Sequence, residues 1–181
     1  MLQEREILNQ ESIVIMIERL SYELIENHHV FDNTVLIGVQ PRGTYLNNRI
    51  LNQLNQILPN HYIQSGNVDI AFYRDDFMRR ESPIVPQEMD ISCSIEGKDV
   101  VLIDDVLFTG RSIRSAIDAI MSFGRPSSVE LLALIDRRFS RHLPIQANYI
   151  GKKVDAIESE KIIVEWEETS GIDRVLMRKI E

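Results

Sequence analysis

Two adjacent carboxylates stand between an apolar run and a helix-like segment near the middle of the chain. Residues 100–103 are all Val, Leu or Ile and predict a buried strand, and Asp104 and Asp105 follow them directly. Apolar residues recur at helical spacing over 113–121, so the turn 109–112 opens a helix. Ligands of open α/β sheets bind at the carboxyl ends of the strands, where this turn lies. The segment therefore predicts an α/β fold with a ligand site at that edge of the sheet.

The residue types in this turn favour a phosphorylated sugar as the ligand. Backbone N–H groups and the helix dipole attract a phosphate, and the hydroxyls of Thr109 and Ser112 add donors. Asp104 and Asp105 repel phosphate, so they suit sugar hydroxyls or a metal ion that bridges sugar and phosphate. An ordinary helix cap by Thr109 or Ser112 is the alternative, although capping requires neither carboxylate. The spacing of a nucleotide P-loop is absent.

Composition limits the class of protein. A chain of 181 residues, 44% of them hydrophobic, fits one soluble domain over residues 1–181. No apolar run is long enough for a membrane span, and one cysteine, Cys93, fits a reducing cytoplasm. Lys and Arg total 20 against 28 Asp and Glu, a net charge of −8. That balance argues against DNA or RNA as the main partner.

The remaining pattern alternates between helical and strand periodicity, which predicts a mainly parallel central sheet flanked by helices. A helix is expected over 12–27, with Ser12 as its N-cap, and another over 45–58. Strands are expected at 34–39, 68–73, 128–135, 148–151, 162–166 and 174–177. Segment 74–96 is highly charged and aperiodic, which predicts a mobile loop or an extended hairpin.

Two arginines follow other expected strands. Arg42, in the turn Pro41-Arg42-Gly43, stands at the same edge as the two carboxylates, and its planar guanidinium suits a diphosphate. Arg74 opens the long charged segment. A surface turn and a solvated charge cluster are the alternatives for these two positions.

Residues 100–112 resemble the phosphoribosyl diphosphate (PRPP) motif of type I phosphoribosyltransferases. The resemblance implies that fold, with the acids holding the ribose hydroxyls and the following loop cradling the 5′-phosphate. It also implies a loop after the first strand that binds the pyrophosphate, and a mobile loop that closes over the site, where Arg74 caps the diphosphate. The implied PRPP-binding residues are Pro41, Arg42, Gly43, Asp104, Asp105, Val106, Leu107, Phe108, Thr109, Gly110, Arg111 and Ser112.

Segments 73–76, 124–128, 143–145 and 149–152 resemble, in order, the pyrimidine operon attenuation regulator (PyrR) family. This resemblance implies a uracil phosphoribosyltransferase that converts uracil and PRPP to UMP and pyrophosphate. The implied cofactor is Mg²⁺, bound mainly through PRPP near the two acids, and the implied assembly is a homodimer or larger. Purine transferases of this type carry an Asp where this chain has Phe108. Base contacts are implied at Arg137 and near Ile162.

The sequence departs from the family at two places. The loop 136–144 has one extra residue, and Arg138 replaces a glycine. RNA-binding members carry Thr and His where this chain has Glu18 and Tyr22, and an Arg where it has Gln146. A basic stretch at 137–154 favours RNA contact, so two functions stay open. They are an enzyme with weakened or absent RNA binding, and an RNA-binding sensor of UMP or PRPP with little turnover.

Overall fold

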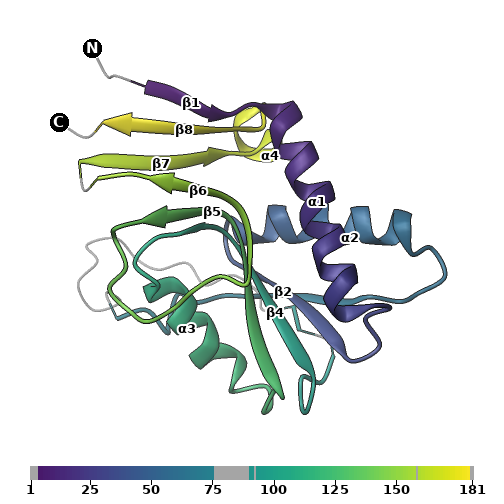
Figure 1. The fold of residues 1–181 in the computed structure, drawn as a ribbon. Coiled ribbons are helices and arrows are strands. Elements are labelled where there is room, and N and C mark those ends of the chain that lie inside the picture. The colour runs from purple at the N-terminus through teal and green to yellow at the C-terminus, as the bar shows by residue number, and fades with distance from the viewer. Residues whose placement is uncertain (1–3, 76–89, 92, 158, 180–181) are drawn as a thin grey trace.

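A computed structural model describes residues 4–75, 90–91, 93–157 and 159–179 (Figure 1). Its centre is a five-stranded parallel sheet in the order β3-β2-β4-β5-β6. The strands are β2 (Thr34–Val39), β3 (Gln64–Val68), β4 (Asp99–Leu107), β5 (Ser128–Arg138) and β6 (Tyr149–Asp155). The predicted central parallel sheet is confirmed.

Helices cover both faces of this sheet. On one face, α1 (Gln10–His28) and α2 (Gly43–Ile57) pack through leucines and isoleucines such as Leu20 and Leu46. On the other face, α3 (Arg111–Ile120) packs through Ile113, and the two faces have separate apolar clusters (Figure 1). In the described part of the chain, no helix is long and apolar enough to cross a membrane.

A second, three-stranded antiparallel sheet has the order β1-β8-β7 and lies beside the β5–β6 side of the central sheet (Figure 1). It consists of β1 (Glu4–Leu8), β7 (Glu160–Glu165) and β8 (Arg174–Lys179), and the short helix α4 (Glu167–Ser170) joins β7 to β8. We call it the small sheet. Ile162 and Val164 of β7, and Trp166 at the start of α4, belong to the same apolar cluster as α1 and α2.

Arg49 of α2 is the polar link between the helical face and the small sheet. Its guanidinium donates to both oxygens of Asp173, at 2.8 and 3.0 Å, and to Glu168 at 2.7 Å. It also lies 4.6 Å from the centroid of the Trp166 ring. The Arg49 and Asp173 side chains are 20% and 8% exposed. The pair is therefore largely withdrawn from water.

Several predicted boundaries are wrong in detail. Asn9, not Ser12, caps α1, because its Oδ1 accepts the Ser12 N–H at 2.9 Å. Strand β3 ends at Val68, where the sequence predicted a strand to begin. The expected loop or hairpin after Arg74 falls largely on 76–89, outside the described residues.

Candidate active site at the carboxyl edge of the sheet

The parallel register brings the predicted site residues to one edge of the central sheet. Gly38 of β2 pairs with Ile103 of β4, and Leu107 pairs with Asp136 of β5. The segments that follow β2, β4 and β5 therefore leave the sheet side by side. They carry Arg42, the 108–112 turn and the β5–β6 connection, respectively.

Gly43 allows the first of these segments to approach the second. A Cβ atom at Gly43, the first residue of α2, would collide with the carbonyl oxygen of Ile103 and lie 3.1 Å from the Cα of Asp104. The residue before it, Arg42, is exposed, and its positive charge acts on both Asp104 and Asp105. Pro41 follows a cis peptide bond. The structure thus brings the Pro41–Gly43 turn against the acid pair.

Asp104 and Asp105 are buried, at 8% and 7% exposure, although the sequence predicted that they follow the strand. They lie inside β4, which continues to Leu107. The backbone N–H of Asp105 donates to Oδ1 of Asp104 at 2.9 Å. Oδ2 of Asp105 is buried and has no hydrogen-bond partner among the described residues. Asp104, but not Asp105, lines the cavity at the following turn.

Burial raises the pKa of both carboxyls. The pKa of Asp104 is raised most, first by desolvation and then by the neighbouring Asp105, while Arg42 opposes the shift. Desolvation also raises the pKa of Asp105, against the effect of Arg42. Burial destabilises the ionised form of a carboxyl because it removes hydrating water. A ligand that donates hydrogen bonds or supplies positive charge would stabilise the ionised form of this pair.

The turn after β4, residues 108–112, is called the phosphate loop below. Together with Arg74 and Asp104 it lines a cavity of about 230 Å³. Gly110 occupies the N-cap position of α3 with φ of +90°, a left-handed conformation that suits glycine, and no side chain caps the helix. Thr109 Oγ1 accepts the Arg111 N–H at 3.3 Å. The helix start therefore has the uncapped N–H groups that anion binding requires.

Charged side chains connect the phosphate loop to the start of the long charged segment. Arg111 donates to Asp75, and Arg74 lines the same cavity. Asp76, which completes the motif identified in the sequence, lies outside the described residues. Arg74 and the phosphate loop border the same cavity.

Phe108 connects the phosphate loop to Arg137 at the end of β5. The Arg137 guanidinium carbon lies 4.0 Å from the centroid of the Phe108 ring, which is a cation–π contact. Arg137 is 5% exposed and donates to the carbonyls of Ile157 and Glu160, at 3.3 and 2.9 Å. Its Nε has no partner among the described residues. The nearby Ile162 side chain is buried in β7.

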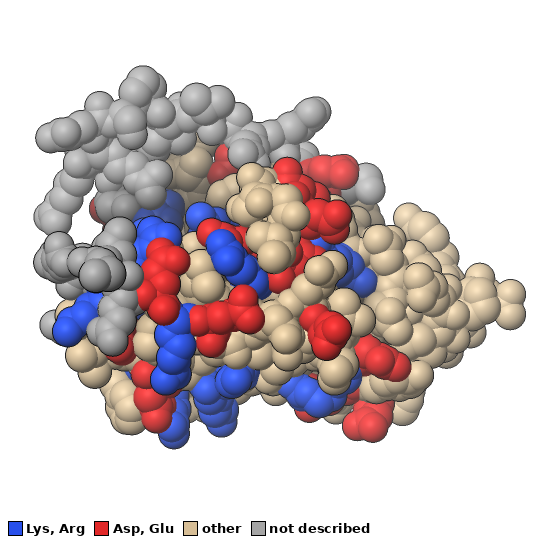
Figure 2. Space-filling view, turned by 90° about the horizontal axis from the view of Figure 1, so that it is seen from above, with Lys and Arg blue, Asp and Glu red and all other residues tan. Residues whose placement is uncertain are grey.

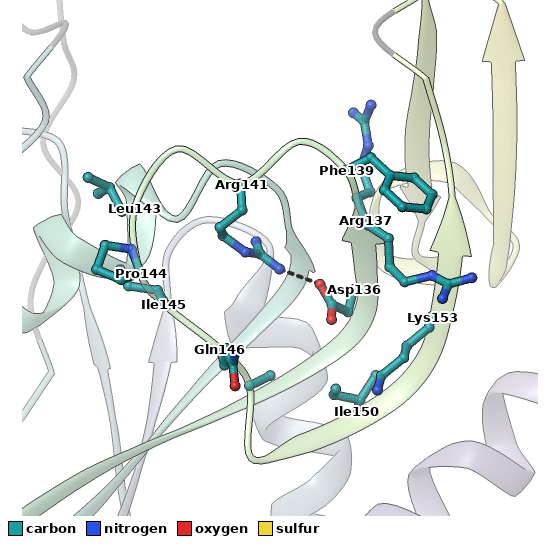
Figure 3. A pocket seen from close by; sticks show the side chains of 12 residues that line it. Asp136, Arg137, Phe139, Arg141, Leu143, Pro144, Ile145, Gln146, Ile150 and Lys153 are labelled. Atoms are coloured by element: carbon teal, nitrogen blue, oxygen red, sulfur yellow. Dashed lines mark hydrogen bonds and ion pairs between the residues drawn. The ribbon is translucent and has the colours of Figure 1, made fainter.

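A larger cavity of about 510 Å³ lies beneath the connection between β5 and β6, residues 139–148 (Figure 3). It is lined by Asp136, Arg137, Arg138, Phe139, Arg141, Leu143, Pro144, Ile145, Gln146, Ala147, Ile150 and Lys153. The sequence indicated a basic stretch, a base contact at Arg137 and a loop that departs from the family's pattern here. It did not predict that Arg141 turns inward to Asp136, because that pair depends on the path of the connection.

The residues that the structure describes contain no cluster of three or more His, Cys, Asp or Glu side chains that could hold a metal ion. Among the described carboxylates near the phosphate loop, Asp75 is paired with Arg111, whereas Oδ2 of Asp105 has no hydrogen-bond partner. Mg²⁺ prefers oxygen ligands. Its remaining ligands are usually water molecules or the oxygens of a substrate phosphate. The donor set thus fits a metal ion that is bound mainly by a substrate.

A test of the acid pair follows from the direction of its pKa shifts. A raised folded-state pKa means that the native protein holds the proton more tightly than the unfolded chain, so stability falls as pH rises from about 4. We expect Asp104→Asn to gain about 1 kcal/mol at pH 7, or roughly 2–4 °C in Tm. The gain should shrink towards pH 4. Thermal unfolding across pH measures it, and a Tm that falls at pH 7 would refute the assignment.

Comparisons with known proteins agree with this fold. Residues 3–168 match the family described as the phosphoribosyl transferase domain. Among solved structures, hypoxanthine phosphoribosyltransferase of Trypanosoma cruzi has a TM-score of 0.72 at 17% identity, over 98% of this chain and 97% of that one. The enzyme of Staphylococcus aureus gives 0.70 at 20% identity, over 94% and 90% of the two chains. The chain therefore belongs to the phosphoribosyl transferase domain family.

Curated relatives define its branch of that family. "Bifunctional protein pyrR" of Enterococcus faecalis is 42% identical over 176 residues, 97% of each chain. "Bifunctional protein PyrR" of Streptococcus equi is 45% identical over 159 residues, 88% of each chain. The "pyrimidine operon regulatory protein" of Lactococcus lactis is 43% identical over 175 residues, 97% of each chain. The branch is that of the PyrR proteins, as the motifs in the sequence predicted.

Proposed function

We propose that this protein is a uracil phosphoribosyltransferase, which converts uracil and PRPP to UMP and pyrophosphate. The observation that carries the proposal is the buried pair Asp104 and Asp105 among the last residues of β4 before the phosphate loop, which leads into α3 without a side-chain cap. Membership of the PyrR branch supports pyrimidine as the base. The similarity to hypoxanthine transferases, at 20% identity or less, concerns the fold alone.

Each group at the edge has a role in this reaction. The N–H groups of the phosphate loop hold the 5′-phosphate, and the acid pair holds the ribose hydroxyls. Arg42 and Arg74 bind the diphosphate and offset the charge that it gains on leaving. Loss of pyrophosphate leaves positive charge on the ribose, so catalysis consists of positioning and electrostatic stabilisation.

Magnesium enters this proposal with PRPP. The buried, unpartnered Oδ2 of Asp105 and the neighbouring carboxyl of Asp104 are the groups that would lie near it. Bound to substrate oxygens, Mg²⁺ would supply positive charge to the diphosphate. No side chain is assigned as its dedicated ligand.

The base site is proposed between the phosphate loop and the small sheet. Phe108 offers an exposed aromatic face, at 41% exposure, and Arg137 has a buried, unpartnered Nε donor beside it. A uracil carbonyl can accept from that donor, while backbone groups near Ile162 complete the edge. The enzyme is proposed to act in the cytoplasm as one domain in each subunit of a homodimer or larger assembly.

The direct test is turnover. Purified protein with labelled uracil, PRPP and Mg²⁺ should yield UMP and pyrophosphate, and hypoxanthine in place of uracil should react far more slowly. Turnover with hypoxanthine that equals or exceeds turnover with uracil would overturn the pyrimidine assignment. Absence of turnover with either base, while PRPP or UMP still binds, would favour a sensor.

Regulation by RNA binding is the second candidate, and the names of the relatives motivate it. Charge pairing weakens the case for it. In the basic stretch, Arg138 pairs with Asp155 at 2.5 Å and Arg141 pairs with Asp136. Acidic and basic side chains also lie interspersed on the described part of the face shown in Figure 2. We therefore propose weak or absent RNA binding. Nanomolar, UMP-dependent binding of a pyrimidine leader RNA in a gel shift would overturn this.

A further inference from the structure

The β5–β6 connection contacts the backbone of the phosphate loop through hydrogen bonds. Arg141 in that connection is partly buried, with a side chain 24% exposed, and it points across the cavity to Asp136 (Figure 3). One guanidinium nitrogen donates to Oδ1 of Asp136, and the other donates to the backbone carbonyl of Phe108. The side chain therefore joins β5 to the first residue of the phosphate loop.

The backbone of the same connection also forms hydrogen bonds with Thr109, the next residue of the phosphate loop. The N–H groups of His142 and Leu143 both donate to the carbonyl of Thr109, at 3.0 and 3.2 Å. The side chains of Leu143 and Ile145 lie 3.5 and 3.4 Å from where a Cβ of Gly110 would stand. The connection thus contacts three successive residues of the phosphate loop, Phe108, Thr109 and Gly110.

Fixing these carbonyls also fixes the donors that face a ligand. In a trans peptide, the C=O of one residue and the N–H of the next point in opposite directions. The Phe108 carbonyl held by Arg141 therefore directs the Thr109 N–H away from the connection. The Thr109 carbonyl directs the Gly110 N–H in the same way. Among the described residues, neither N–H has a hydrogen-bond partner.

We propose that Arg141 is a positioning residue that sets the peptide planes of the phosphate loop before PRPP arrives. It acts through the Phe108 carbonyl and does not touch the substrate. The bond to Asp136 keeps the guanidinium from turning to solvent. Preorganised donors cost no rearrangement when the phosphate binds, so the effect falls on PRPP affinity. The role in PRPP binding rests on the proposed function, whereas the fixed loop conformation does not.

The test compares Arg141→Met with Arg141→Lys and with Arg138→Met as the matched control. Arg138 lies in the same region and pairs with Asp155, but it does not reach the phosphate loop in the structure. Backbone order parameters of residues 108–112 are measured by NMR relaxation without ligand, since most N–H groups there have no hydrogen-bond partner among the described residues. Calorimetry measures PRPP·Mg²⁺ binding without uracil, and thermal unfolding monitors the fold.

We expect Arg141→Met to lower the backbone order parameters at 108–112 and to weaken PRPP binding about tenfold, with an intermediate effect for Arg141→Lys and none for Arg138→Met. Unchanged order parameters in Arg141→Met, with a native Tm, would overturn the positioning role. An equal loss of order across the whole chain, with a lowered Tm, would also overturn it and indicate a general stabilising role.

The two proposals fail in different ways. If the wild type binds no PRPP, the proposed function fails, and the NMR order parameters still decide whether Arg141 fixes the loop. If the wild type binds PRPP and Arg141→Met binds it equally well, the positioning role fails and the proposed function stands. Steady-state kinetics of Arg141→Met provide a further check. The KM for PRPP should rise by a larger factor than kcat falls.

Discussion

Asp105→Asn should lower uracil phosphoribosyltransferase turnover by about a hundredfold while leaving the protein as stable as the wild type or more stable. The substitution keeps the size of the side chain and removes its charge. Its buried Oδ2 has no partner within the described residues, so no internal ion pair is lost. The loss should therefore fall on the substrate, whose ribose hydroxyls or associated cation lose a charged acceptor.

Steady-state kinetics and thermal unfolding of the same preparations measure both effects. Asp118→Asn is the matched control, because Asp118 is an exposed residue of α3 that pairs with Arg114 on the helix surface. It should keep full turnover. Less than a tenfold loss of turnover in Asp105→Asn would show that the assigned role is wrong.

Arg49→Met should destabilise the fold by about 3 kcal/mol, which is the order expected when one partner of a largely buried ion pair is removed. Asp173, at 6% exposure, would keep only the bond from the Glu167 N–H, at 2.8 Å. The contact of the guanidinium with Trp166 would be lost as well. Because α2 and the small sheet share this link, both should loosen together.

Urea unfolding, followed by circular dichroism, measures this loss. Arg114→Met removes an arginine from an ion pair whose side chains are 48% and 46% exposed, and should cost less than about 1 kcal/mol. Equal losses in the two variants would show that the Arg49 link contributes no more than a surface ion pair.

The central sheet and its ligand edge could be predicted because their signals are local. Residues 100–103 form an uninterrupted apolar run, and parallel strands place their carboxyl ends together. This is how Arg42 and the acid pair could be assigned to one edge before any coordinates. The PyrR resemblance, confirmed by the curated relatives, came from short ordered motifs.

Other features could not be predicted because they depend on contacts far apart in the chain. Strand β1 is short and charged, and it pairs with β8, whose Arg178 meets Glu4 at 2.5 Å. The cap of α1 was misplaced because both Asn9 and Ser12 are good cap residues, and only the path of the backbone decides between them. The inward turn of Arg141 likewise depends on a connection without regular secondary structure.

The position of the β5–β6 connection has a consequence for redesigning this enzyme. One end of the connection adjoins Arg137, which stacks on Phe108 beside the proposed base site, and its middle braces the phosphate loop. Random mutagenesis across the whole connection would therefore confuse base selectivity with sugar-phosphate affinity. A library that varies 139 and 140 and keeps 141–145 unchanged would leave the contacts to Phe108, Thr109 and Gly110 intact.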